Sequence, residues 1–172
     1  MGRTKTLVFV GLLIAMEVIF SRFLAFQTPI LKIGFEFIPV AFAGIMFGPI
    51  IGGVTGSLSD IIGMMIFPTG GSYFPGFTLR AFIGGAVYGL FLHKKPVTLF
   101  TVAKSVVIIV FLVNIGLNTL WVSMLTGKAV SVLIIPRVYK NLIMLPIQTI
   151  TIQLLWKYIG SHINAVKYAR PN

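Results

Sequence analysis

The sequence contains no cysteine and only three acidic residues, Glu17, Glu36 and Asp60. Without cysteine there is no disulfide, no cysteine nucleophile and no thiolate metal site, although the redox compartment stays open. So few acids leave no evident pair of carboxylates for acid–base catalysis. The two histidines, His93 and His162, lack the spacing of a metal-binding pair and an acid that would orient either as a general base. The sequence therefore predicts that the protein is not an enzyme and holds neither a cofactor nor a metal ion.

Charge of either sign is also scarce. Charged residues make up 10% of the chain and hydrophobic residues 57%, with a mean hydropathy of +1.01, whereas about a quarter of the residues of soluble domains are charged. The long apolar stretches are broken by Gly and Pro and show no strand-length alternation of apolar and polar residues, which favours helices over a barrel. We therefore expect an all-α integral membrane protein, with residues 1–172 forming a single membrane domain.

Signals for nucleotide or nucleic-acid binding are absent too. There is no Walker-type phosphate loop, and the connections between apolar stretches are too short to hold a nucleotide-binding domain. The net charge of +11 would indicate a nucleic-acid partner in a soluble protein. Here no basic run with interleaved aromatic residues lies outside the apolar stretches, and basic residues at one membrane face are the ordinary topology signal. We expect no nucleic-acid partner and no ATP hydrolysis by this chain.

Six apolar segments are predicted to be helices, and together they form a six-helix transmembrane bundle. They cover residues 6–21, 35–48, 50–67, 76–93, 97–124 and 133–160. The second differs in length, because about 14 residues span only about 21 Å, less than a hydrocarbon core of about 30 Å. It also contains Pro39. We predict that it is either a short helix packed inside the bundle or a broken helix.

The basic residues predict the orientation. With the N-terminus in the cytoplasm, eight of them lie on or near the cytoplasmic face, as the positive-inside rule prefers. They are Arg3, Lys5, Lys94, Lys95, Lys104, Lys157, Lys167 and Arg170. An even number of helices returns the C-terminus to the same side. The first segment is kept as a helix of the mature protein, because no small-residue cleavage site follows it.

The remaining cations fall toward the outer half, where the insertion rule disfavours them. They are Arg22, Lys32, Arg80, Lys128, Arg137 and Lys140. A pocket for an anionic ligand is the simplest explanation. The alternative is that some of these side chains extend to lipid headgroups, which applies to Lys32 and Lys128 and also to the pair Arg137 and Lys140.

A polar stripe lies on the fifth segment. Asn114, Asn118 and Trp121 fall at positions i, i+4 and i+7 and so share one helical face. Polar groups at membrane depth cost several kcal/mol unless they meet partners or line a cavity. Amides that donate and accept, next to an indole ring, suit a heterocyclic ligand. The alternative is hydrogen bonding between helices, with Trp121 at the membrane interface.

A second stripe runs along the sixth segment. Arg137 and Lys140 share a face near its start, and Asn141 and Gln148 continue the same stripe. A guanidinium binds a carboxylate through two hydrogen bonds, whereas an ammonium acts as a point charge. No Gly-rich phosphate cradle accompanies the pair, so the stripe suits a dicarboxylate better than a phosphate.

The connection 68–76 reads as a loop because it is rich in Gly and Pro, and it carries Tyr73 and Phe74. Gly76 and Thr78 open the next helix, so free backbone N–H groups lie close to two aromatic rings. A conjugated anion could stack on the rings while its charge meets the helix end.

Asp60 lies well inside a predicted helix, where it either accepts hydrogen bonds from an amino-substituted ring or pairs with Arg80 or another buried cation. For Glu17 a structural partner is expected.

Small residues spaced by four predict where helices approach closely. The sets are Gly11 with Ala15, Gly52 with Gly56, and Ala81 with Gly85 and Gly89. We expect the last two sets to pack within the chain. The first set lies on the leading helix and is a candidate contact for a partner subunit.

Several motifs together resemble one known family. They are Ser21-Arg22-Phe23-Leu24, Phe-Gly-Pro at 47–49, Ser-Asp-Ile-Ile-Gly at 59–63, Leu-Asn-Thr-Leu-Trp at 117–121 and Pro-Arg-Val-Tyr-Lys-Asn at 136–141. Over nearly the whole chain they are similar to the folate-specific substrate-binding (S) component of energy-coupling factor (ECF) vitamin transporters. In that family the first pair of small residues is usually two alanines, so Gly11 is a departure that still allows close approach.

The resemblance implies a function and roles for individual residues. An S component of the prokaryotic cell membrane captures folate at the outer face, docks on a membrane-embedded coupling subunit with two ATPase subunits, and delivers the vitamin across the membrane. The implied roles are Asn114, Asn118 and Trp121 for the pterin ring, Tyr73 and Phe74 for stacking, Arg22, Arg137 and Lys140 for the carboxylates, and Gly11 and Ala15 for docking. Asp60 and Arg80 are further candidates from the residues themselves; the family is associated with a small polar residue at the position of Arg80, so this chain departs from it there. Residues 22–34 are predicted to close over the ligand.

Two other functions stay open at this level. One is an S component for a different anionic vitamin; cationic thiamine fits poorly among six outer cations. The other is a transporter or channel that works without partners, although no inverted repeat, ring of charges or hydrophobic gate can be read from the sequence.

Overall fold

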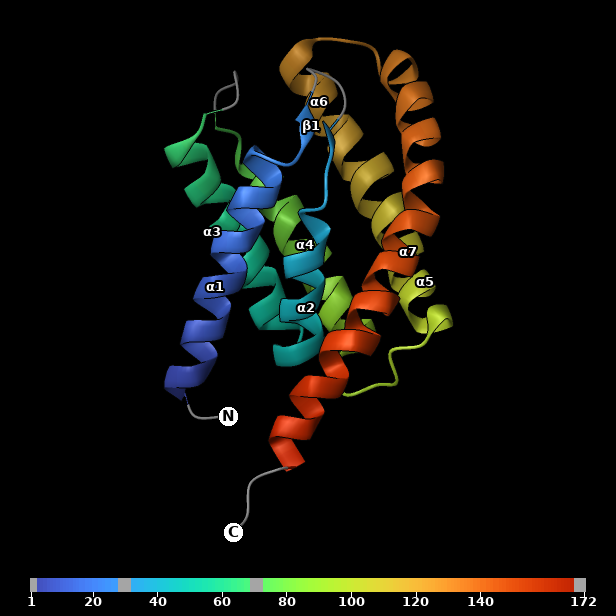
Figure 1. Ribbon diagram of the computed structural model, residues 1–172. Coiled ribbons are helices and arrows are strands. Elements are labelled where there is room, and N and C mark those ends of the chain that lie inside the picture. The colour runs from blue at the N-terminus through green and yellow to red at the C-terminus, as the bar shows by residue number, and fades with distance from the viewer. Residues whose placement is uncertain (1–2, 28–31, 69–72, 169–172) are drawn as a thin grey trace.

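The computed structural model describes residues 3–27, 32–68 and 73–168, and side chains within them up to residue 160 apart from Gln27. These residues form a helical bundle (Figure 1). Its helices are α1 (Arg3–Arg22), α2 (Phe37–Phe47), α3 (Pro49–Ile66), α4 (Pro75–Leu92), α5 (Leu99–Ile108), the π-helix η1 (Ile109–Leu117), α6 (Asn118–Thr126) and α7 (Val130–Tyr168). The short strands β1 (Phe26–Gln27) and β2 (Lys32–Ile33) pair antiparallel, a small addition to the all-α expectation.

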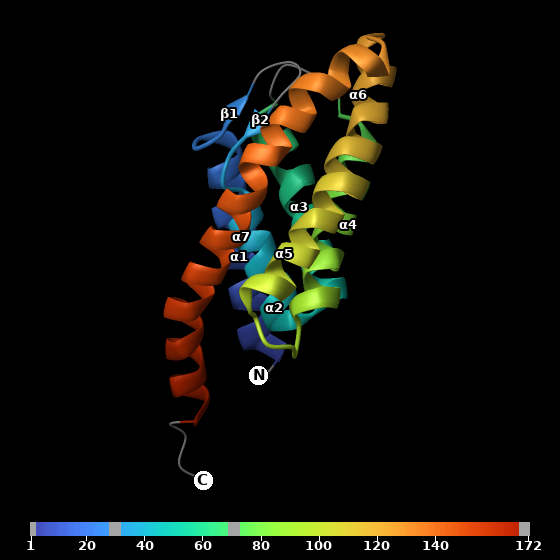
Figure 2. The same cartoon turned by 90° about the vertical axis from the view of Figure 1, so that its right-hand side faces the viewer.

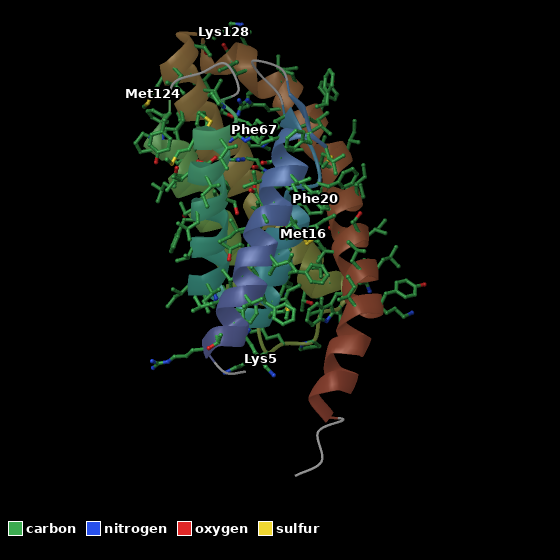
Figure 3. The ribbon with its side chains drawn as sticks, turned by 60° about the vertical axis from the view of Figure 1, so that its left-hand side comes forward. Lys5, Met16, Phe20, Phe67, Met124 and Lys128 are labelled. Atoms are coloured by element: carbon green, nitrogen blue, oxygen red, sulfur yellow. The ribbon has the colours of Figure 1, made fainter. Side chains whose placement is uncertain are left out.

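The bundle has two distinct ends. Both termini lie at one of them, which we call the terminal end, and β1, β2 and the turn between α6 and α7 lie at the other, the hairpin end (Figure 1). Lys5 marks the terminal end and Lys128 the hairpin end (Figure 3). Helix α7 has 39 residues, or about 58 Å of helix, and it extends past the other helices at the terminal end (Figure 2).

Length and hydropathy show which helices can cross a membrane. In the described part of the chain five helical stretches qualify, and α5, η1 and α6 together make one of them, Leu99–Thr126. Large apolar side chains such as Leu7, Ile50 and Leu90 point outward and are more than half exposed. An apolar surface of this extent is expected where lipid replaces water. The predicted fold class, a helical membrane bundle, is confirmed.

Helix α2 decides whether the short second segment is a packed short helix or a broken one. It is a continuous helix of 11 residues, and Pro39, Ala41, Ala43 and Gly44 on it are buried. Its small residues let α4 approach closely, because a Cβ on Gly44 would lie only 2.8 Å from the backbone nitrogen of Gly89. The segment is therefore a short helix packed inside the bundle. Neighbouring helices cover it, so it need not span the hydrocarbon core itself.

Helices α3 and α4 meet through the glycines that the sequence singled out. A Cβ on Gly52 would lie 2.6 Å from the carbonyl oxygen of Gly85, and one on Gly56 would lie 2.6 Å from that of Ala81. Such distances leave no room for a side chain, so the two backbones are in direct contact. By contrast, a Cβ on Gly84 would meet no atom within 4 Å.

This contrast predicts that Gly85→Ala destabilises the protein and Gly84→Ala does not. A methyl group on Gly85 would overlap the Gly52 carbonyl and force α3 and α4 apart, at a cost of about 1–3 kcal/mol. On Gly84 the same substitution only raises helix propensity. Thermal unfolding in detergent measures both variants, and equal midpoints would contradict the close contact.

The π-helix interrupts the long fifth segment at its centre. Asn114 lies inside η1, whereas Asn118 begins α6. A π-helical turn is wider than an α-helical one, so residues that follow it are rotated relative to a continuous α-helix. Because π-helical turns change the angle per residue, the i, i+4, i+7 stripe expected for Asn114, Asn118 and Trp121 does not have the even spacing of a continuous α-helix.

Candidate ligand-binding site

A pocket lies between α1, the start of α2, α4, η1 and α7, on the side of the hairpin end. Three cations and two acids line it: Lys32, Arg80, Lys140, Glu17 and Glu36. The Lys32 ammonium lies 3.5 Å from the Glu36 carboxylate. No described acid forms an ion pair with Arg80 or Lys140. The pocket thus combines positive charge with few counter-ions inside an apolar bundle.

Amide groups hold the wall between α4 and α7. The guanidinium of Arg80 donates to the side-chain oxygen of Asn114 at 3.3 Å, and the Asn114 amide donates to Asn141 at 3.4 Å. Asn141 in turn donates to the backbone oxygen of Arg137 at 2.9 Å. The hydrogen-bond partner of the Arg80 guanidinium is thus a neutral amide and not a carboxylate. Its positive charge therefore stays available to an anionic ligand.

Several buried polar atoms in this pocket have no hydrogen-bond partner among the described residues. They are Glu17 Oε2, Glu36 Oε2, Arg80 Nε, Tyr88 OH and Gln148 Oε1. All five residues line the same pocket. Buried polar groups in native proteins are almost always paired, and leaving one unpaired costs about 1–3 kcal/mol. Their gathering at one place is the pattern of a site that is completed by a ligand.

An aromatic group lies near the start of α4 and the first turn of α6. The ring of Phe74 lies 5.8 Å from Phe77 and 6.4 Å from Trp121, both edge to face. Gly76 makes this packing possible, because its Cβ would fall 2.8 Å from the indole of Trp121. Phe74, on which a ligand was expected to stack, thus contacts two rings of the protein itself.

A chain of hydrogen bonds connects Tyr73 to α3. The Tyr73 hydroxyl lies 3.0 Å from that of Thr78, which donates to Asp60 Oδ2 at 2.8 Å. Thr78 is therefore the partner that the structure shows for Asp60, where the sequence offered a ligand or Arg80. Residues 69–72 of the expected loop 68–76 lie outside the described residues.

The residues expected to bind the ligand divide into two groups. Asn114, Lys140 and the further candidate Arg80 line the pocket. The others are not among the lining residues: Arg22, Asp60, Tyr73, Phe74, Asn118, Trp121 and Arg137. Arg22 packs against Gly63 of α3, and Arg137 is 3% exposed with a 3.5 Å hydrogen bond to Thr119.

The structure adds pocket residues that the sequence did not place there. Glu17 was expected to have a structural partner, yet its Oε2 atom is unpaired among the described residues. Gln148 belonged to the polar stripe of the sixth segment, so its spacing from Lys140 was a usable signal. Tyr88 gave no signal, since one tyrosine in an apolar segment is more often a core residue. No cluster of three or more potential metal ligands occurs in the described ranges.

The face of α1 that points away from the pocket is not covered by any other described helix. No atom would lie within 4 Å of a Cβ on Gly11, and Ala15 is exposed. Leu12 and Ile19 on the same face are also exposed. Figure 3 shows α1 in front of the other helices. Unlike the glycines of α3 and α4, this pair of small residues is not used for packing within the chain.

Comparisons of the sequence with known proteins identify its family and its relatives. Over residues 5–156 the sequence matches the model of a family described as the ECF transporter, substrate-specific component. The folate transporter FolT of Clostridium novyi (strain NT) is 49% identical over 159 residues, which cover 92% of each chain. FolT of Leuconostoc mesenteroides subsp. mesenteroides is 34% identical over 167 residues, covering 92% of this chain and 89% of the relative.

A solved structure has the same fold. It is described as the crystal structure of FolT bound with folic acid, and it matches with a TM-score of 0.84 at 43% identity. The match covers 88% of this chain and 92% of the other. Both the family profile and the fold agree with the resemblance seen in the sequence motifs. This chain therefore belongs to the family of substrate-specific components of ECF transporters.

Proposed function

We propose that this chain, as one membrane domain, is the folate-binding S component of an ECF importer. The observation that carries the proposal is the pocket itself, in which Arg80 and Lys140, which form no ion pair with a described acid, lie among amides and unpaired polar atoms. Folate has an aminated pterin ring and a glutamate with two carboxylates, so it needs both kinds of group. Relatives named folate transporters support this choice over another anionic vitamin.

Lys32, Arg80 and Lys140 are assigned to the carboxylates, because they are the cations that line the pocket. An ionic hydrogen bond to a carboxylate contributes about 1.5–3 kcal/mol in a buried site. Asn114 lies beside Arg80 and is assigned to the ring or its linker. The expected contacts of Arg22, Asn118, Trp121 and Arg137, and stacking on Tyr73 and Phe74, stay predictions.

The orientation proposed is hairpin end outside, with both termini in the cytoplasm of a prokaryotic cell. The described basic residues away from the pocket support it, since Lys94 and Lys95 follow α4 at the terminal end. Folate then enters from outside at the hairpin end. Closure by residues 22–34 remains a prediction, and 28–31 lie outside the described residues, as do the side chains of Lys167 and Arg170.

The partners proposed are a membrane-embedded coupling subunit and two ATPase subunits. The chain has no nucleotide-binding motif, and in this proposal the ATPase subunits supply the energy for uptake. The uncovered face of α1 around Gly11 and Ala15 is the proposed docking surface. Small residues there let a partner helix approach closely within lipid.

Titration of the purified chain with folate in detergent tests the function. Trp121 contacts Phe74 and Trp156 contacts Phe42, so tryptophan fluorescence reports on both ends of the bundle. We expect saturable quenching that thiamine and biotin do not reverse. A folded, monodisperse sample that shows no response to folate would reject the assignment.

A further inference from the structure

Three of the unpaired polar atoms come from three different helices. Glu17 Oε2 belongs to α1, Tyr88 OH to α4 and Gln148 Oε1 to α7, and each side chain is at most 8% exposed. All three residues line the pocket. Among the described acids, Glu17 alone is both buried and left with an unpaired carboxyl oxygen as well as no ion pair. Glu36 is more exposed and forms an ion pair with Lys32.

Tyr88 and Gln148 lie deeper than the cations on the same helices. Tyr88 follows Arg80 by about two turns of α4, and Gln148 follows Lys140 by about two turns of α7, which is about 12 Å of helix in each case. Both helices run from the hairpin end toward the terminal end (Figure 1). The cations therefore lie closer to the hairpin end, and the tyrosine and glutamine form a deeper part of the pocket.

The groups that line the pocket differ in hydrogen-bonding capacity. Lysine and arginine only donate hydrogen bonds, whereas the unpaired atoms of Glu17 and Gln148 are carbonyl or carboxyl oxygens that accept them. The tyrosine hydroxyl does both. A matching ligand carries both negative charge and several N–H donors.

Folate has that distribution of groups. Its pterin ring carries an amino group at C2 next to the N–H at N3, two parallel donors on one edge. A carboxyl group offers two oxygens side by side, so it can accept from both donors at once, as it does from a guanidinium. A glutamine in the same place offers one acceptor and a competing donor.

We propose that Glu17 determines specificity for the pterin by accepting hydrogen bonds from the C2 amino group and N3–H, with Gln148 and Tyr88 completing this subsite. The inference rests on the proposed folate function and adds to it the recognition of the ring. Glu17 lies on the buried face of α1, together with Leu13, Val18 and Ser21. The side chain is therefore held in place by the packing of that helix.

The test compares two ligands with two proteins. Folic acid and its 2-desamino-2-methyl analogue differ only at C2, where the analogue lacks one of the two donors that Glu17 is proposed to bind. We expect the wild-type chain to bind folic acid about tenfold or more tightly than the analogue. In Glu17→Gln the affinity for folic acid falls by a similar factor while that for the analogue barely changes, so the preference disappears.

Two controls separate this result from a general loss of structure. N-(4-aminobenzoyl)glutamate carries the carboxylates without the pterin, and both proteins should bind it equally. Glu36→Gln changes the other carboxyl group of the pocket and should retain the preference for folic acid.

Two results would overturn the inference. One is a Glu17→Gln variant that keeps the wild-type preference. The other needs no variant: equal affinities of the wild-type chain for the two ligands. Either would leave folate binding itself intact, whereas a wild-type chain that binds no folate would reject the proposed function as well.

Discussion

Replacing Lys140 by methionine is expected to weaken folate binding about tenfold or more. Lys140 lines the pocket, and no described acid neutralises it. Its ammonium would therefore form a charge-assisted bond to a folate carboxylate, which contributes about 1.5–3 kcal/mol, and each 1.4 kcal/mol is about a tenfold change in the dissociation constant. Methionine keeps an unbranched side chain and removes only the charge. Fluorescence titration in detergent measures the effect.

Lys128→Met is the matched control. Lys128 is exposed in the turn after α6 and does not line the pocket, so its loss should leave the dissociation constant within about twofold. Equal affinities for the Lys140 and Lys128 variants would remove Lys140 from the site. Arg137→Ala in the same series tests the cation that shares a helical face with Lys140, and an unchanged affinity would give Arg137 a structural role between α6 and α7.

Replacing Ala15 by tryptophan is expected to abolish most folate uptake without changing folate binding. Gly11 and Ala15 leave a shallow surface on α1 that meets no other part of the described chain. A large ring there would keep a partner helix from approaching, because close backbone contact is the main source of helix association in lipid. Uptake by vesicles that contain the coupling subunit and both ATPases should fall about tenfold or more.

Leu142→Trp provides the control for added bulk. Leu142 is 59% exposed on α7, so tryptophan there adds the same ring to a lipid-facing surface of another helix. Uptake should remain near the wild-type level, and both variants should titrate with folate like the wild-type chain. Normal uptake by Ala15→Trp would place the docking surface elsewhere.

Helix α1 links the two proposed activities. One face carries Glu17 into the pocket, and the other presents Gly11 and Ala15 to the membrane. A movement of this helix on docking would reach the ligand through Glu17 directly. The pocket and the docking surface are thus separated by the width of a single helix.

The pair Gly11 and Ala15 shows what residue spacing can predict and what it cannot. Spacing by four predicted close approach for three sets of residues, and the structure uses the sets on α3 and α4 within the chain. It leaves Gly11 and Ala15 open. The spacing of small residues identifies a helix surface that another helix can approach closely. It does not show which helix does so, because that depends on which helices are neighbours in the folded protein.

The sequence by itself determined the membrane environment, the order and approximate limits of the helices, and the family, because hydropathy and short motifs are local properties of the chain. It also marked Lys140, Asn114 and Arg80 as cations and amides out of place in lipid. Only the tertiary structure decided that Glu17, Tyr88 and Gln148 share a pocket with them. These residues are far apart in the chain, and their meeting depends on how α1, α4 and α7 pack. The structure also places Asn114 of η1 in the pocket wall but not Asn118 or Trp121, and no hydropathy pattern encodes the wider turns of a π-helix.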